Sequence, residues 1–202
     1  MSLERIDNVL PQPFFDFIKE DIQNTPWYHI SVTHNAEMEG TIEKDYSFSS
    51  QVFEDDQHIS YDAYLWVSVF YNLLDAFGFK YGDLVRLLRI RKGMLPNIGE
   101  EHVHGAHVDY DIRHYTILLY MDTIERGGET ILYKNIRNQK WREQSQQVDA
   151  EPLEVEQLSP SVENSAILFD GLRFHSSSSP LDKNTRTAIN FNFIAKKRLT
   201  NL

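Results

Sequence analysis

The sequence of 202 residues contains no cysteine, which excludes disulfides, a thiolate nucleophile and a cysteine-ligated zinc site. No apolar run approaches the roughly 18 residues that a membrane-spanning helix needs. The first ten residues, MSLERIDNVL, carry charges and lack the apolar stretch of a secretory signal peptide. These absences predict a cytoplasmic protein that does not engage a membrane.

Basic residues are scarce relative to acidic ones. The chain has 20 Lys and Arg against 30 Asp and Glu, a formal net charge of −10, which makes nucleic acid an unfavourable partner. Hydrophobic residues make up 41% and charged residues 25%, as in an ordinary globular protein. No repeat or low-complexity linker divides the sequence, so we expect a single domain over 1–202. The composition leaves the oligomeric state open.

Residues 1–80 have mixed patterns. Apolar residues at helical spacing predict helices over Pro13–Gln23 and Ser60–Phe77, the second of which Gly78 ends. The aromatic and β-branched segment Trp27–Thr33 predicts a strand. We expect this part of the chain to support the remainder.

Residues 81–202 change to short β-type runs that Gly, Pro, Asn and Asp separate, a pattern typical of a sandwich or barrel. The overall class is therefore mainly β with flanking helices (α+β). The predicted strands are Leu84–Arg91, Tyr115–Met121, Thr130–Tyr133, Leu153–Leu158, Ala166–Phe169 and Thr187–Ile194.

The last of these strands has two unlike faces, because side chains alternate along a strand. The apolar face can pack under the N-terminal helices and holds Thr187, Ile189, Phe191 and Phe193. The polar face can line a cavity and holds Arg186, Ala188, Asn190 and Asn192. In the strand Tyr115–Met121, the side chains expected to face the same cavity are Thr116, Leu118 and Tyr120.

Four residues form a pattern with chemical meaning. In extended chain His107 and Asp109 point the same way, and His175 follows an apolar strand and a turn that can return it to them. Two His and one carboxylate make the facial triad of non-haem Fe(II) oxygenases, which leaves coordination positions open on one side. Arg186 follows, and its guanidinium can grip a carboxylate with paired hydrogen bonds.

Several stretches resemble the 2-oxoglutarate/Fe(II)-dependent dioxygenases, in particular the prolyl-4-hydroxylase-like branch and its small single-domain members in phage. The resemblance covers about half the chain, from Arg86 to Ile194. The matching pieces, in family order, are His107-Val108-Asp109, Tyr115–Asp122 (YTILLYMD), Gly127-Gly128-Glu129-Thr130 (GGET), Ala166–His175 (AILFDGLRFH) and Arg186–Phe193 (RTAINFNF).

The resemblance implies a double-stranded β-helix, also called a jelly roll, of the kind that cupins share. It implies that His107, Asp109 and His175 hold Fe(II) and that Arg186 binds the far carboxylate of 2-oxoglutarate, with Tyr120 and Thr116 completing the cradle. The implied reaction couples decarboxylation of 2-oxoglutarate, with O2, to hydroxylation of a C–H bond, and ascorbate is an expected accessory reductant.

The implied substrate is a protein side chain of the prolyl type or a small amino-acid-like molecule. Where the DNA-dealkylating branch of the family carries a second Arg, this chain has Asn192, which argues against base repair. Asn190 and Asn192 are expected to line the pocket.

Two other readings stay open at this point. A cupin-like metalloenzyme would use His102 and His104, although Pro96 and Asp109 stand where that pattern has Gly and Glu. A non-catalytic jelly-roll binding module would need no metal at all. In the oxygenase reading His102 and His104 are loop residues at the mouth and His114 is structural.

Two further segments carry expectations. The basic run Arg86, Arg89, Arg91 and Lys92 is expected to be mostly a solvated face, with one Arg at the entrance to attract an acidic substrate. The polar segment Asn135–Gln147 is long and lacks periodicity, which suits either an exposed hairpin or a lid over the site.

Overall fold

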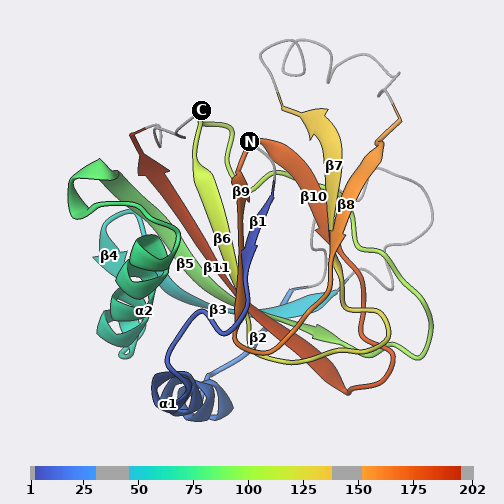
Figure 1. Cartoon of the computed structure of the whole chain (residues 1–202). Coiled ribbons are helices and arrows are strands. Elements are labelled where there is room, and N and C mark those ends of the chain that lie inside the picture. Colours follow the sequence, from blue (N-terminus) through green and yellow to red (C-terminus); the bar gives the residue numbers. More distant parts are fainter. Residues whose placement is uncertain (1–2, 31–45, 138–151, 197–202) are drawn as a thin grey trace.

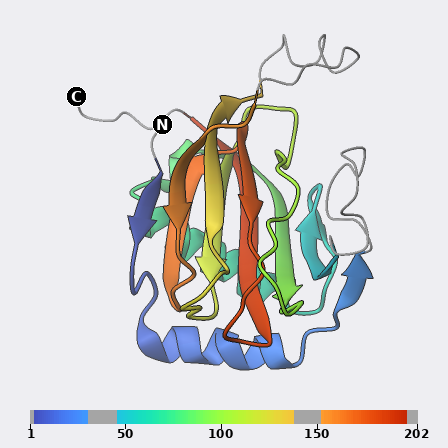
Figure 2. The same ribbon diagram turned by 90° about the vertical axis from the view of Figure 1, so that its right-hand side faces the viewer.

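The structure is a computed structural model that describes residues 3–30, 46–137 and 152–196. Its strands form two antiparallel sheets that lie opposite each other (Figure 1, Figure 2). The larger sheet has the order β1-β9-β6-β11-β5-β3-β2, with β4 added to β3, and the smaller has the order β10-β7-β8. The elements are β1 (Glu4–Ile6), α1 (Gln12–Gln23), β2 (Tyr28–Ile30), β3 (Ser47–Glu54), β4 (Gln57–His58), α2 (Ala63–Ala76), a short 3-10 turn (Tyr81–Asp83), β5 (Leu84–Pro96), β6 (Tyr115–Tyr120), β7 (Thr130–Ile136), β8 (Val155–Ser159), β9 (Ser165–Asp170), β10 (Arg173–Ser177) and β11 (Thr185–Ala195).

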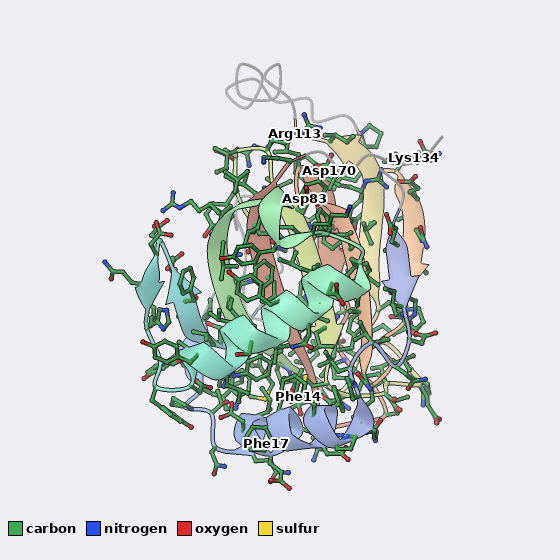
Figure 3. All side chains as sticks on the ribbon, turned by 60° about the vertical axis from the view of Figure 1, so that its left-hand side comes forward. Phe14, Phe17, Asp83, Arg113, Lys134 and Asp170 are labelled. Carbon is green, nitrogen blue, oxygen red and sulfur yellow. The ribbon has the colours of Figure 1, made fainter. Side chains whose placement is uncertain are left out.

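Helix α2 covers the outer face of the larger sheet, and α1 crosses the end of the molecule below it (Figure 3). Phe70 of α2 packs on two residues of β11, with ring centroids 5.9 Å from Phe191 and 5.2 Å from Phe193. Helix α1 buries Phe15 on its inner side, while Phe17, labelled in Figure 3, is 57% exposed. The predicted packing of the apolar face of β11 under a helix is confirmed.

Helix α2 begins three residues later than predicted, for a physical reason. Asp62 stands at the capping position but makes no side-chain bond to the helix N-terminus. Its carboxylate accepts hydrogen bonds from Lys92 and Ser60 instead. The predicted end is confirmed, because Phe77 is the C-cap and Gly78 adopts the positive φ of 73° that favours glycine.

All six predicted strands of the second half are present. The predicted strand Trp27–Thr33 is described up to Ile30, and that part contains β2. The sequence reading missed β1, β3, β4 and β10. Strand β1 is short, and β10 (RFHSS) has almost no apolar alternation to reveal it. Because β1 pairs with β9 and β3 pairs with β5, the first 80 residues add strands to the larger sheet as well as helices.

The inner faces of the two sheets enclose a second, smaller core. Tyr120 and Leu118 of β6 pack there with Leu132 of β7 and Ala188 of β11. The predicted cavity-side direction of Leu118 and Tyr120 is therefore confirmed. The segment Asn135–Gln147, predicted as an exposed hairpin or a lid, lies outside the described residues from residue 138 onward. No helix in the described ranges is long and apolar enough to cross a membrane.

Candidate metal and co-substrate site

The loop between β5 and β6 carries His107 and Asp109 to the edge of the smaller sheet. There the backbone of His107 pairs with that of His175 in β10, with N–O distances of 2.9 Å in both directions. The Asp170-Gly171 region before β10 makes the turn that returns the chain, as the sequence predicts. The two His and Asp109 therefore meet through backbone pairing, before any metal is considered.

The three side chains offer ligand atoms that all lie within 4.8 Å of one another. His175 Nε2 is 3.7 Å from Asp109 Oδ2, and the two imidazole centroids are 4.4 Å apart. The Nδ1 atom of His107 lies 3.1 Å from the Gly105 carbonyl oxygen, and that of His175 lies 3.1 Å from the Arg173 carbonyl oxygen. A carbonyl oxygen only accepts, so both Nδ1 atoms donate and both Nε2 atoms are left as lone-pair ligands.

Asp109 is held by three partners. Arg89 donates to Oδ1 at 2.6 Å, and Asn190 and Asn192 donate to Oδ2 at 3.0 and 2.9 Å. Burial by itself raises the pKa of this carboxyl, but nearby positive charge, that of Arg89 first, outweighs burial and holds the pKa of Asp109 well below its usual value. Asp109 is therefore an oriented, ionised carboxylate.

Arg186 lies in the same cavity, 4% exposed, without a carboxylate partner among the described residues. Its Nη2 donates to Thr130 Oγ1 at 2.8 Å, and its guanidinium lies 5.3 Å from the centre of the Tyr120 ring. The Tyr120 hydroxyl also donates to Thr130, at 2.9 Å, while Arg186 Nε is buried and makes no hydrogen bond. A buried cation with an unused donor suits an anionic ligand.

The structure places Thr116 differently from the cradle role expected of it. Thr116 pairs with Asn192 near the end of β11 and accepts a hydrogen bond from its amide at 3.1 Å, whereas Arg186 lies near the start of that strand. Its hydroxyl therefore supports the amide that holds Asp109. Thr130, from the GGET turn, takes the position beside Arg186 instead.

His102 and His104 do not join a group of three potential metal ligands in the described part of the chain. His104 lies in the loop between β5 and β6, where it is buried, lines the cavity beside His107 and bonds Ser179 Oγ at 3.2 Å. His114 lies apart, with its ring packed against Gly171 so closely that a Cβ there would come within 2.1 Å. Burial lowers the pKa of His114, and its placement agrees with the structural role expected of it.

The prediction that the basic residues of β5 mostly form a solvated face is wrong. Only Arg86 is solvated, where it pairs with Asp56 at 2.8 Å. Arg89 holds Asp109, Arg91 lines the cavity, and Lys92 is 1% exposed among acidic partners. A strand with polar side chains toward solvent and one with polar side chains toward a cavity have the same alternation, so the sequence could not separate the two.

Two site residues escaped the sequence reading. Thr130 was visible inside the GGET motif but had no assigned partner. Arg89 was named only as part of a basic run, because its role depends on its pairing across the sheet with Asn192, a register that the sequence does not reveal.

No protein-family model matches the sequence, and no curated protein is significantly similar to it in sequence. Solved structures are similar in fold. The α-ketoglutarate-dependent epimerase SnoN from nogalamycin biosynthesis matches with a TM-score of 0.67 at 11% identity, over 99% of this chain and 82% of its own. A 2OG-Fe(II) oxygenase family oxidoreductase from Burkholderia pseudomallei gives 0.65 at 11% identity, over 95% and 84%.

A prolyl-4-hydroxylase from Pseudomonas putida gives a TM-score of 0.56 at 12% identity, over 95% of this chain and 92% of its own. SnoN has also been solved in complex with Fe3+, α-ketoglutarate and nogalamycin RO. The chain therefore has the double-stranded β-helix fold of the 2-oxoglutarate/Fe(II) oxygenases.

Proposed function

We propose that this protein is an Fe(II)- and 2-oxoglutarate-dependent oxygenase. The observation that carries the proposal is one cavity that contains both His107 and His175 of the triad and the buried Arg186. A metal with two imidazoles and one carboxylate needs further ligands, and Arg186 offers the charge that would hold the far end of a chelating 2-oxo acid.

The residues fit both groups. His107, Asp109 and His175 would hold Fe(II), since both His donate through Nδ1, which puts the lone pair of each ring on Nε2, and Asp109 is ionised. Arg186, kept in place by Thr130 and the Tyr120 ring, would bind the distal carboxylate of 2-oxoglutarate. When bound, iron and 2-oxoglutarate supply the oxidation of a substrate C–H bond by O2, with succinate and CO2 as co-products.

The chain's own residues orient the metal-binding carboxylate and exclude water from the cavity. Asn190 and Asn192 fix the direction of the Asp109 carboxylate. Leu118 and Ala188 give the cavity wall an apolar surface between the triad and Arg186. In this fold a polypeptide of the prolyl type and a small amino-acid-like molecule both stand as candidate substrates, and ascorbate would serve as reductant.

Anaerobic titration with Fe(II), with and without 2-oxoglutarate, tests the proposal. The visible charge-transfer band of an iron chelate should appear only when both are present. His107→Ala and His175→Ala should abolish metal binding, while the neighbouring His102→Ala should leave most of it. A cupin-like enzyme is the better reading if His102 and His104 prove essential and the triad does not, and a non-catalytic module is the better one if neither pair binds metal.

A further inference from the structure

The cavity holds a second, partly buried cation that the proposed function does not use. Two arginines, Arg91 and Arg186, line its wall, and no Asp or Glu is among the described residues that line it. Arg186 has a role toward 2-oxoglutarate, whereas Arg91 has none. A wall with two cations and no acid favours anionic contents.

Arg91 is not neutralised by a direct contact. No hydrogen bond or ion pair joins its guanidinium to another described residue. The nearest site carboxylate, that of Asp109, is already engaged by Arg89 at 2.6 Å. Burial lowers the pKa of Arg91 and the charge of Arg89 lowers it further, while Asp109, Tyr110 and Glu54 counteract them only through space. Keeping such a charge inside a protein without a counter-ion is costly.

A second unpartnered donor lies beside it. Gln51 of β3 is the direct cross-strand neighbour of Arg91, and the Gln51 Nε2 is buried with no acceptor in the described part of the chain. Directly opposite residues of antiparallel strands point to the same face. On that face Ser49 also lines the cavity. The β3 side of the cavity is thus rich in donors and lacks an acceptor of negative charge.

The position of Arg91 separates it from the 2-oxoglutarate anchor. Arg91 pairs with Asn190, which holds Asp109, whereas Arg186 pairs with Leu95 at the other end of the cavity. The two backbone positions are roughly 13 Å apart along the strands. An anion on Arg91 would therefore lie beside the metal ligands, where a substrate must be, and away from the Arg186 end.

Resting on the proposed function, we infer that the substrate carries a carboxylate, which Arg91 binds on the β3 side of the cavity with Gln51 as second donor. One guanidinium matches one carboxylate in charge and in paired hydrogen bonds. A doubly charged phosphate would leave negative charge unmatched, because Arg91 and Arg186 are the Lys and Arg residues among the described residues that line the cavity, and Arg186 lies at its other end.

The first test needs neither metal nor substrate. Arg91→Met should raise the melting temperature of the metal-free protein in a buffer without carboxylate or phosphate, because it removes a partly buried charge that has no ion-pair partner among the described residues. Arg86→Met is the matched control, from the same strand but exposed and paired with Asp56, and it should change the melting temperature little. A lower melting temperature for Arg91→Met would show that the charge is used structurally and would overturn the inference.

The second test uses the protein loaded with Mn(II) and saturating 2-oxoglutarate under argon, so that Arg186 is occupied. Acetate should raise its melting temperature and acetamide, the neutral isostere, should not. Arg91→Met should weaken the apparent affinity for acetate roughly tenfold or more, as expected for a charged hydrogen-bonded contact, and Arg86→Met should keep it. Affinity for 2-oxoglutarate should be the same in all three proteins.

The remaining outcomes are each decisive. Stabilisation by phosphate through Arg91, without an effect of acetate, would overturn the carboxylate assignment. A loss of 2-oxoglutarate affinity in Arg91→Met would make Arg91 part of the co-substrate site and overturn the inference while leaving the proposed function. A wild-type protein that binds no 2-oxoglutarate would instead overturn the proposed function, and this inference with it.

Discussion

At the scale of single residues, the charged groups of the site are of two kinds: Asp109 is paired within the protein, and Arg186 keeps a donor for a ligand. Asp109 has both carboxylate oxygens engaged by donors, and each triad His has its Nδ1 fixed by a backbone carbonyl. Such outer contacts fix the orientation of a ligand before the metal arrives. Arg186, in contrast, keeps one donor unused, which is the condition expected of a co-substrate anchor.

The substitution Arg186→Ala distinguishes metal binding from 2-oxoglutarate binding. We expect it to weaken 2-oxoglutarate binding by about 1.5–3 kcal/mol or more, because a charged hydrogen-bonded contact is lost. Affinity for Fe(II) or Mn(II) should be nearly unchanged, since Arg186 bonds Thr130 and none of the triad. Calorimetric titration of metal and of 2-oxoglutarate measures both. Equal loss of the two affinities would make Arg186 structural.

Arg89→Gln should have the opposite selectivity, weakening metal binding more than 2-oxoglutarate binding. Arg89 donates to Asp109 Oδ1 and to the Asn192 amide oxygen, so its removal loosens the carboxylate ligand. We expect metal affinity to fall roughly 10- to 100-fold, the usual effect of removing such an outer contact. The exposed Arg86→Gln is the control and should bind metal as the wild type does. Unchanged metal affinity in Arg89→Gln would mean that the two Asn alone orient Asp109.

At the scale of elements, one buried ionic cluster joins the helices to the larger sheet. Lys92 of β5 donates to Asp21 of α1 and to Asp62 before α2, and also to Thr25. Trp66 of α2 donates to both carboxylates. Removing one member of a buried ion pair leaves the other uncompensated, so this cluster fixes where both helices dock.

The cluster makes stability depend on acid pH. Burial opposes ionisation of Asp62, but hydrogen bonds from Lys92 and Ser60 outweigh it and lower its pKa from 3.8 to about 2. A depressed pKa adds stability that is fully present above the unfolded value and is lost as the pH falls through the folded one. We therefore expect the difference in unfolding free energy between wild type and Asp62→Asn to shrink by up to about 2 kcal/mol between pH 5 and pH 2.

Urea denaturation across that pH range measures the difference. Asp16→Asn on α1 is the control, because its exposed carboxylate only accepts a hydrogen bond from Gln12 and its loss should cost little. A wild type and Asp62→Asn that lose stability in parallel as the pH falls would contradict the assigned role of Lys92.

The elements that could be predicted from the sequence are those with a strong apolar periodicity. Strand β11 and helix α2 bury one continuous apolar face, so periodicity was enough. Strand β10 was missed, because its polar sequence is held by pairing with β7 and by the backbone of His107. Sequence order and spacing sufficed to predict that His107, Asp109 and His175 come together near Arg186. The positions of Arg89 and Thr130 beside them depended on strand register, which no local pattern specifies.

At the scale of the whole molecule, the site is assembled from both sheets. His175 and Thr130 come from the smaller sheet, Arg186 and Asn190 from the larger one, and Asp109 from the loop between β5 and β6. Figure 1 shows the two sheets diverging from each other toward one end of the molecule. A metal held by His175 of the smaller sheet and a chelating co-substrate bound by Arg186 of the larger one would connect the two sheets.

We therefore expect metal and 2-oxoglutarate to stabilise the folded protein together more than either does alone. A ligand that binds only the folded state adds about 2.7 kcal/mol at one hundred times its dissociation constant. Melting temperatures with Mn(II), with 2-oxoglutarate and with both, under argon, measure the effect. His175→Ala should lose the response to metal, and with it the additional response to 2-oxoglutarate, because chelation needs the ion. A full response to 2-oxoglutarate without metal would mean that Arg186 binds it unaided and that the co-substrate does not bridge the metal and the larger sheet.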